Sequence, residues 1–159
     1  MTFGFGNPVQ GPRIVPYLQP RTSRDVLPNG HPGFRVTQLY STSNDVFNPG
    51  HPHLAIDIGN FYCGDKLLSM SSGRVSYLRD PNGALGVQVT HPTGWRTQLW
   101  HIARYRVLNG YWSPRRGVWI ADVSSTGLDI GGCHCHVVTI SPGGVYVNPW
   151  YMLDQNQND

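Results

Sequence analysis

At 159 residues, with 39% hydrophobic and 13% charged residues, the chain is long enough for one domain with a proper core and too short for two ordinary ones. It has no apolar run of membrane-spanning length, and its start lacks the basic and apolar stretches of a signal peptide. The net charge of +3 comes from scattered basic residues, which favours an anionic partner such as a cell-wall surface and argues against a dedicated nucleic-acid binder.

Glycine and proline are abundant, at 19 and 13 residues, and no segment shows a sustained helical stripe. This composition predicts a mainly β domain of short strands with few or no long helices. All nine acidic residues are Asp. The helical His-Glu-x-x-His metalloprotease motif, whose Glu is the general base, is therefore excluded, and any base must be His or Asp.

The three cysteines, Cys63, Cys133 and Cys135, make an odd count. They can include one disulfide, but no framework of disulfides can hold the fold. Free thiols are therefore the default expectation.

Residues 1–33 hold six of the thirteen prolines, with almost no hydrophobic periodicity between them. Such a segment buries little surface by itself, and we predict an extended arm that docks on a partner or on the domain's own flank. A disordered tail is the alternative. Because the arm carries no candidate ligand, a chain that starts near Gly30 is expected to fold and to bind metal. Residues 34–153 form the predicted domain, and residues 154–159 form a polar tail.

From residue 34 the pattern changes to short β-rich runs separated by turn signals. The predicted strands fall within residues 34–40, 54–59, 66–70, 73–78, 86–90, 95–102, 117–123 and 134–140, with turns at 80–83, 91–94 and 124–127. This series of short strands predicts an antiparallel β domain.

Residues 53–58 read HLAIDI, and their period predicts a strand in which His53 and Asp57 lie opposite the buried face. Four residues of extended chain span about 13 Å, whereas two ligands of one tetrahedral zinc lie only about 3.5 Å apart. If His53 and Asp57 share a metal, the chain must bend near His53. The prolines and glycine just before it favour such a bend.

Residues 134–140 place His134 and His136 on one face of a predicted strand and Cys135 on the other. Two imidazoles about 6–7 Å apart at the backbone cannot easily be identical ligands of one metal, but one can be a ligand and the other a neighbour of the bound water. A half-buried strand with two hydrogen-bonded histidines is the alternative. His101 ends another strand-like alternation, and the pattern leaves open whether it faces a core or a cleft.

Taken together, these segments resemble the lysostaphin-type zinc metallopeptidases, also called the LytM-like or duplicated-hybrid-motif peptidase domain, from about residue 34 to residue 153. The landmarks are a His-x-x-x-Asp strand at 53–57, a Gly-x-Pro-Val-like stretch at 64–75, a Tyr-x-His-Leu-Ser-like element at 98–104, a Gly-Ser-Thr-Gly-like turn at 124–127, a His-x-His strand at 134–136 and a Val-x-Pro end at 147–149. Each landmark is weak alone, but their order and spacing are specific.

The resemblance implies that His53, Asp57 and His136 are zinc ligands and that His101 and His134 are unliganded catalytic histidines. Two imidazoles and one carboxylate leave an open position for water, which is typical of catalytic zinc. Zinc lowers the pKa of that water, and a nearby imidazole can take its proton.

The sequence departs from the family pattern at three positions, none of them a ligand: Ala55 stands for Gly, Cys135 for Leu and Cys133 for Pro. These thiols raise the question of competition for the metal, although alternation places Cys135 on the far face. The remaining histidines, His31, His51 and His91, lie beside prolines and are expected at the surface.

The resemblance implies a shallow, zinc-floored groove that hydrolyses peptide bonds in bacterial peptidoglycan. Small size favours a phage-encoded lysin, carried on the virion tail or released at lysis, in which residues 1–33 contact other virion proteins. The alternative is a structural virion component or cell-wall-binding module that keeps the groove but does no chemistry. The intact set of five positions argues against that alternative.

Overall fold

Antiparallel strand pairing dominates the structure, a computed structural model that describes residues 4–9, 14, 34–43, 45, 49–59, 61–127 and 132–153. All strand pairs in these ranges are antiparallel, and the only helix found there is α1 (Pro149–Met152). The predicted fold class is confirmed. No helix in the described part of the chain has the length and hydropathy to cross a lipid bilayer.

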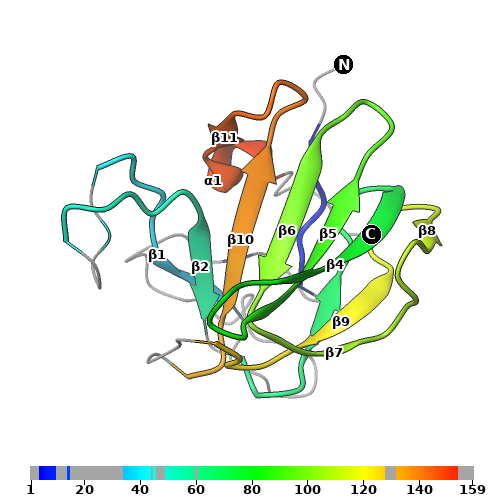
Figure 1. Cartoon of the computed structure of the whole chain (residues 1–159), viewed down its shortest axis with the longest axis horizontal. Coiled ribbons are helices and arrows are strands. Elements are labelled where there is room, and N and C mark those ends of the chain that lie inside the picture. The colour runs from blue at the N-terminus through cyan, green and yellow to red at the C-terminus, as the bar shows by residue number, and fades with distance from the viewer. Residues whose placement is uncertain are drawn as a thin grey trace.

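The larger sheet has the strand order β1-β2-β10-β6-β5-β4-β8, with β11 paired to β10. Its strands are β1 (Arg35–Gln38), β2 (Ile56–Gly59), β4 (Gly73–Arg79), β5 (Leu85–Thr90), β6 (Arg96–Trp100), β8 (Trp112–Ser113), β10 (Cys135–Ile140) and β11 (Tyr146–Val147). Figure 1 shows β10 between β2 and β6, so segments far apart in the sequence lie side by side there.

The smaller sheet has the order β3-β9-β7, formed by β3 (Lys66–Leu68), β7 (Ile102–Tyr105) and β9 (Trp119–Val123). Figure 1 shows β9 and β7 beside the β4 end of the larger sheet. Both sheets contribute to one hydrophobic cluster, which includes Ile58 and Val137 from the larger sheet and Ile120 from the smaller one. The core thus covers one face of the larger sheet, and the opposite face remains for the candidate site.

Residues 4–9 pack against the rest of the described chain. Phe5 is fully buried, donates its backbone N–H to the Met152 carbonyl (2.8 Å) and packs edge-on against Trp95. Farther along, Val9 and Ile14 also belong to the hydrophobic core. Of the uses expected for the proline-rich segment, these residues show docking on the domain itself. Isolated large apolar side chains enter the core there without any periodicity in the sequence. The domain boundary at residue 34 stays a prediction.

Cys63 and Cys133 form a disulfide, and Cys135 is a buried free thiol. The expectation of three free thiols is therefore wrong for two of them. The bond joins the loop after β2 to the segment that leads into β10, although the two cysteines lie 70 residues apart in the sequence. Strand pairing of β2 with β10 brings these segments together, which a count of cysteines does not reveal.

Candidate metal centre

Asp57 and His136 face each other across the antiparallel pair of β2 and β10. Facing residues of such a pair project on the same side of a sheet, with their Cβ atoms about 5 Å apart. Here His136 Nδ1 lies 2.9 Å from Asp57 Oδ1. The β ladder alone therefore places an imidazole beside a carboxylate.

His53 reaches the same place because the chain bends before β2. The strand begins only at Ile56, and residue 55 lies in a bend. His53 itself pairs with Ser41 through two backbone hydrogen bonds of 2.8 Å. The bend brings His53 Nε2 to 3.4 Å from Asp57 Oδ1, so the predicted bend near His53 is confirmed.

The orientation of the His53 ring is fixed by the backbone. Its Nδ1 lies 2.9 Å from the Leu39 carbonyl, and since a carbonyl can only accept, Nδ1 carries the proton. Nε2 is then the ring nitrogen that lies toward Asp57 and is available to a metal. A ring nitrogen anchored in this way is typical of a histidine metal ligand.

The Asp57 carboxylate lies beside two imidazoles, those of His53 and His136. Burial disfavours the ionised form of Asp57, but hydrogen bonds from His136 and His53 and their positive charge outweigh burial and hold the pKa of this carboxyl well below its usual range. Burial likewise acts to lower the pKa of His53, but the hydrogen bond and charge of Asp57 outweigh it and raise the pKa. Asp57 is therefore ionised at neutral pH, as a metal ligand must be.

The candidate ligand atoms of His53, Asp57 and His136 all lie within 4.8 Å of one another. Two imidazoles and a carboxylate fit zinc and leave one coordination position for water. The thiols do not compete: Cys133 is in the disulfide, and burial raises the pKa of the Cys135 thiol and keeps it protonated. The fold brings together the three residues that the resemblance implies as ligands, and their role as ligands stays a prediction.

His101 lies between β6 and β7 and adopts a φ of 68°, a left-handed conformation that residues other than glycine rarely take. The turn breaks the alternation of β6, in which Thr97 and Leu99 are buried. The ring instead lines a pocket with His136, and its Nδ1 lies 2.7 Å from the Thr126 carbonyl. His101 therefore faces a cleft, and strained backbone of this kind is typical of functional sites.

His134 lies just before β10, and its ring centroid is 4.8 Å from that of His101. Its Nδ1 lies 3.0 Å from the Gly132 carbonyl. The His101 and His136 centroids are 6.0 Å apart. The structure thus brings together all five residues singled out from the sequence, while their separate roles stay a proposal.

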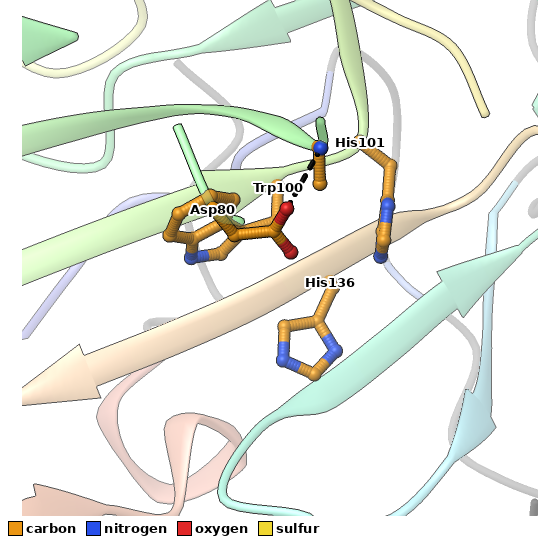
Figure 2. Close-up of a pocket in the computed structure, with 5 residues that line it drawn as sticks. Asp80, Trp100, His101 and His136 are labelled. Atoms are coloured by element: carbon orange, nitrogen blue, oxygen red, sulfur yellow. Dashed lines mark hydrogen bonds between the residues drawn. The ribbon is translucent and has the colours of Figure 1, made fainter. Parts of the chain in front are cut away.

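We call His53, Asp57 and His136 the metal cluster. The pocket beside it has a volume of about 180 Å³ and is lined by Asp80, Ala84, Trp100, His101 and His136. Figure 2 shows the labelled side chains around it. Sequence reasoning missed Asp80 and Trp100. Asp80 stands in an Asp-Pro-Asn-Gly sequence that signals an ordinary turn, and nothing in the sequence indicates that this turn lies next to His101.

The other three histidines lie apart from this cluster or outside the described residues. His51 is exposed, as expected, and His91 is partly exposed in a turn, where its Nδ1 lies 2.7 Å from Thr93 Oγ1. His31 lies outside the described residues.

No protein-family model and no curated protein matches the chain. Solved structures do. The catalytic domain of the antimicrobial peptidase lysostaphin from Staphylococcus simulans aligns with a TM-score of 0.63 and 19% identity over 74% of this chain and 90% of that one. A zinc-containing peptidase from Vibrio cholerae aligns with a TM-score of 0.67 and 20% identity over 92% of this chain and 39% of that one.

A chain of the SpoIIQ–SpoIIIAH pore-forming complex also aligns, with a TM-score of 0.63 and 18% identity over 91% of this chain and 94% of that one. At identities this low, these likenesses show the fold alone. The chain has the fold of the lysostaphin-type peptidase domains, which confirms the resemblance seen in the sequence.

Proposed function

We propose that this domain of lysostaphin-type fold is a zinc endopeptidase that hydrolyses peptide cross-links or bridges of bacterial peptidoglycan. The observation that carries the proposal is the convergence of His53, Asp57 and His136 within 4.8 Å, beside a pocket lined by His101. The likeness to lysostaphin and to a zinc-containing peptidase supports the same activity.

His53, Asp57 and His136 would hold the metal, and bound zinc would supply Lewis acidity and lower the pKa of a water molecule. The chain's own residues account for the rest. Hydrogen bonds from Nδ1 of His101 and of His134 to backbone carbonyls set the tautomer of each ring and make Nε2 the atom that exchanges protons. Their closeness lets one ring take a proton while the other stabilises the charge that develops on the substrate.

The test is to incubate the zinc-loaded protein with peptidoglycan of several chemotypes and to identify the new termini by mass spectrometry. We expect new amino termini from at least one chemotype, and their loss in His101→Ala. His91→Ala is the matched control, because it removes a turn histidine outside the metal cluster. A zinc-loaded protein that releases no termini from any chemotype would overturn the proposal.

A second candidate function is a structural or cell-wall-binding component that keeps the fold without the chemistry. The likeness to a chain of a pore-forming complex favours it, because that alignment covers nearly the whole of both chains. This candidate predicts that the protein sediments with peptidoglycan although no bond is cut. Delivery by a phage virion and contacts of residues 1–33 with other virion proteins are further proposals, tested by looking for the chain in purified particles.

A further inference from the structure

Asp80 follows β4 and begins the turn that leads to β5. Its Oδ1 accepts hydrogen bonds from the backbone N–H groups of Asn82 and Ala84, both at 2.9 Å. The Asp80 N–H in turn donates to the Ala84 carbonyl at 3.0 Å. One carboxylate oxygen is thus used to hold the turn, and the side chain is fixed in place.

The second oxygen of Asp80 has a different environment. Among the described residues, no hydrogen bond or ion pair reaches Oδ2. Figure 2 shows the carboxylate turned toward the space between His101 and His136, with Oδ1 on the dashed bond to the Ala84 N–H. Asp80 lines the pocket, and among the residues that the structure describes it is the only ionisable side chain there besides the two histidines. A negative charge is therefore fixed beside the metal cluster with one oxygen unused.

Trp100 forms the aromatic part of the same pocket. Its indole N–H donates to Gln98 Oε1 at 3.0 Å, and its ring packs so closely on Gly86 that an added Cβ there would lie 2.7 Å from Cε3. The ring is held rigidly as a result. A carboxylate and an aromatic ring in one small pocket suit a cation, which gains a charge-assisted hydrogen bond from the first and a cation–π contact from the second.

We propose that Asp80 determines specificity by binding an ammonium group of the substrate peptide, next to the bond that is cut. The inference rests on the proposed peptidase function and names the substrate class for the same site. The pocket, at about 180 Å³, is small for a ligand site, which suits a primary ammonium and a few methylene groups. Oδ2 of Asp80 accepts from the ammonium while Oδ1 keeps its two bonds to the turn.

The first experiment measures binding and does not depend on activity. Nα-acetyl-lysine amide is titrated into the protein while the indole N–H signal of Trp100 is followed by NMR. We expect a saturable shift that is absent in Asp80→Asn and absent when the side-chain amine of the probe is acetylated. Asn keeps the oxygen that holds the turn and removes only the charge, so the variant folds. An equal shift in Asp80→Asn would overturn the proposal.

The second experiment compares kcat/KM for pairs of peptides that share a scissile bond and differ in one acetylated amine. In one pair the acetylated amine is on a side chain, and in the other it is the amino terminus. The pair in which acetylation lowers kcat/KM identifies the source of the ammonium. We expect the free amine to be preferred by about 10–100-fold, the range for a hydrogen bond to a charged group, and the preference to fall toward 1 in Asp80→Asn.

Asp65→Asn is the matched control, because Asp65 Oδ2 also accepts a backbone N–H, from Tyr62, in a loop outside the pocket. It should keep the full preference. If no peptide is cut by the zinc-loaded parent, the proposed function fails, and the NMR titration still decides the role of Asp80. A parent that cuts both members of every pair equally well would refute the specificity role while leaving the peptidase function intact.

Discussion

The metal cluster and the His101–His134 pair lie side by side but are built by different parts of the backbone. Asp57 and His136 are opposite residues of two paired strands, so the β ladder itself sets their distance. His101 and His134 lie at strand ends, where turns and backbone carbonyls position them. The positions of Asp57 and His136 depend on strand pairing. The positions of His101 and His134 depend on contacts with loops and turns.

The contacts that position His101 and His134 come from several segments. Thr126 anchors His101, and its hydroxyl also bonds to the Ile102 carbonyl and accepts from the Leu85 N–H. His134 follows Cys133, which is tied to Cys63 by the disulfide. We therefore expect that metal affinity and proton transfer, the roles proposed for the two groups, can be disturbed separately.

The largest effect is expected from Asp57→Ala. The change removes the carboxylate that lies within reach of both His53 and His136, so the variant should lose nearly all zinc and all measurable turnover. Elemental analysis after dialysis measures the zinc. Cys135→Ala is the control and should keep one zinc per chain. Stoichiometric zinc in Asp57→Ala would show that the ligands are assigned wrongly.

Replacing His101 or His134 by Ala should separate the two groups. Zinc content should stay at one per chain, because neither residue belongs to the described cluster of candidate ligands. Turnover should fall by a factor of about 10²–10⁴, the range typical of general acid–base groups. Initial rates and elemental analysis on the same samples provide the check. Loss of zinc together with activity would make the residue a ligand.

Phe5→Ala tests a core contact that is far in the sequence from both the metal cluster and the His101–His134 pair. The side chain is fully buried, so its loss should lower the free energy of unfolding by about 3–5 kcal/mol. Urea denaturation measures the change, and Tyr151→Ala, at an exposed aromatic residue, is the control. A chain that starts at Gly30 lacks Phe5, Val9 and Ile14 and should be less stable still. The expectation that it folds and binds metal can be tested on the same sample. A truncated chain of parental stability would show that these contacts contribute little.

The double change Cys63→Ser and Cys133→Ser should have the smallest of these effects. It opens a loop of about 70 residues, and disulfides typically contribute about 2–4 kcal/mol to the free energy of unfolding. Because Cys133 precedes His134, turnover should fall more than zinc affinity does. Denaturation of the variant, and of the parent with and without a reductant, tests the first part. A larger loss of zinc than of turnover would contradict the second.

Strand alternation and motif spacing made much of the site predictable. The period of residues 53–58 placed Asp57 away from the core, and the His-x-His spacing put His134 and His136 on one side with Cys135 opposite, where it is fully buried. The bend near His53 followed from the short distance between ligands of one metal. The roles of the five residues and the domain boundaries stay predictions.

Three features escaped the sequence for a common reason. The burial of Phe5, the pairing of Cys63 with Cys133 and the place of Asp80 beside the pocket all join segments distant in the chain. Local patterns describe which face a side chain takes within one strand. They do not describe which turn or loop lies across from it.

The sequence by itself determined the β class, the five clustered residues and the absence of a glutamate base, because side-chain period and residue type are local properties. Only the tertiary structure decided that His101 faces the cleft, because a single φ of 68° reverses the direction that the alternation of β6 would give it. It also decided that an ordinary turn aspartate borders the metal cluster. Both depend on how β4, β5, β6 and β10 pack together, since distances between strands are set by the whole sheet and not by any one segment.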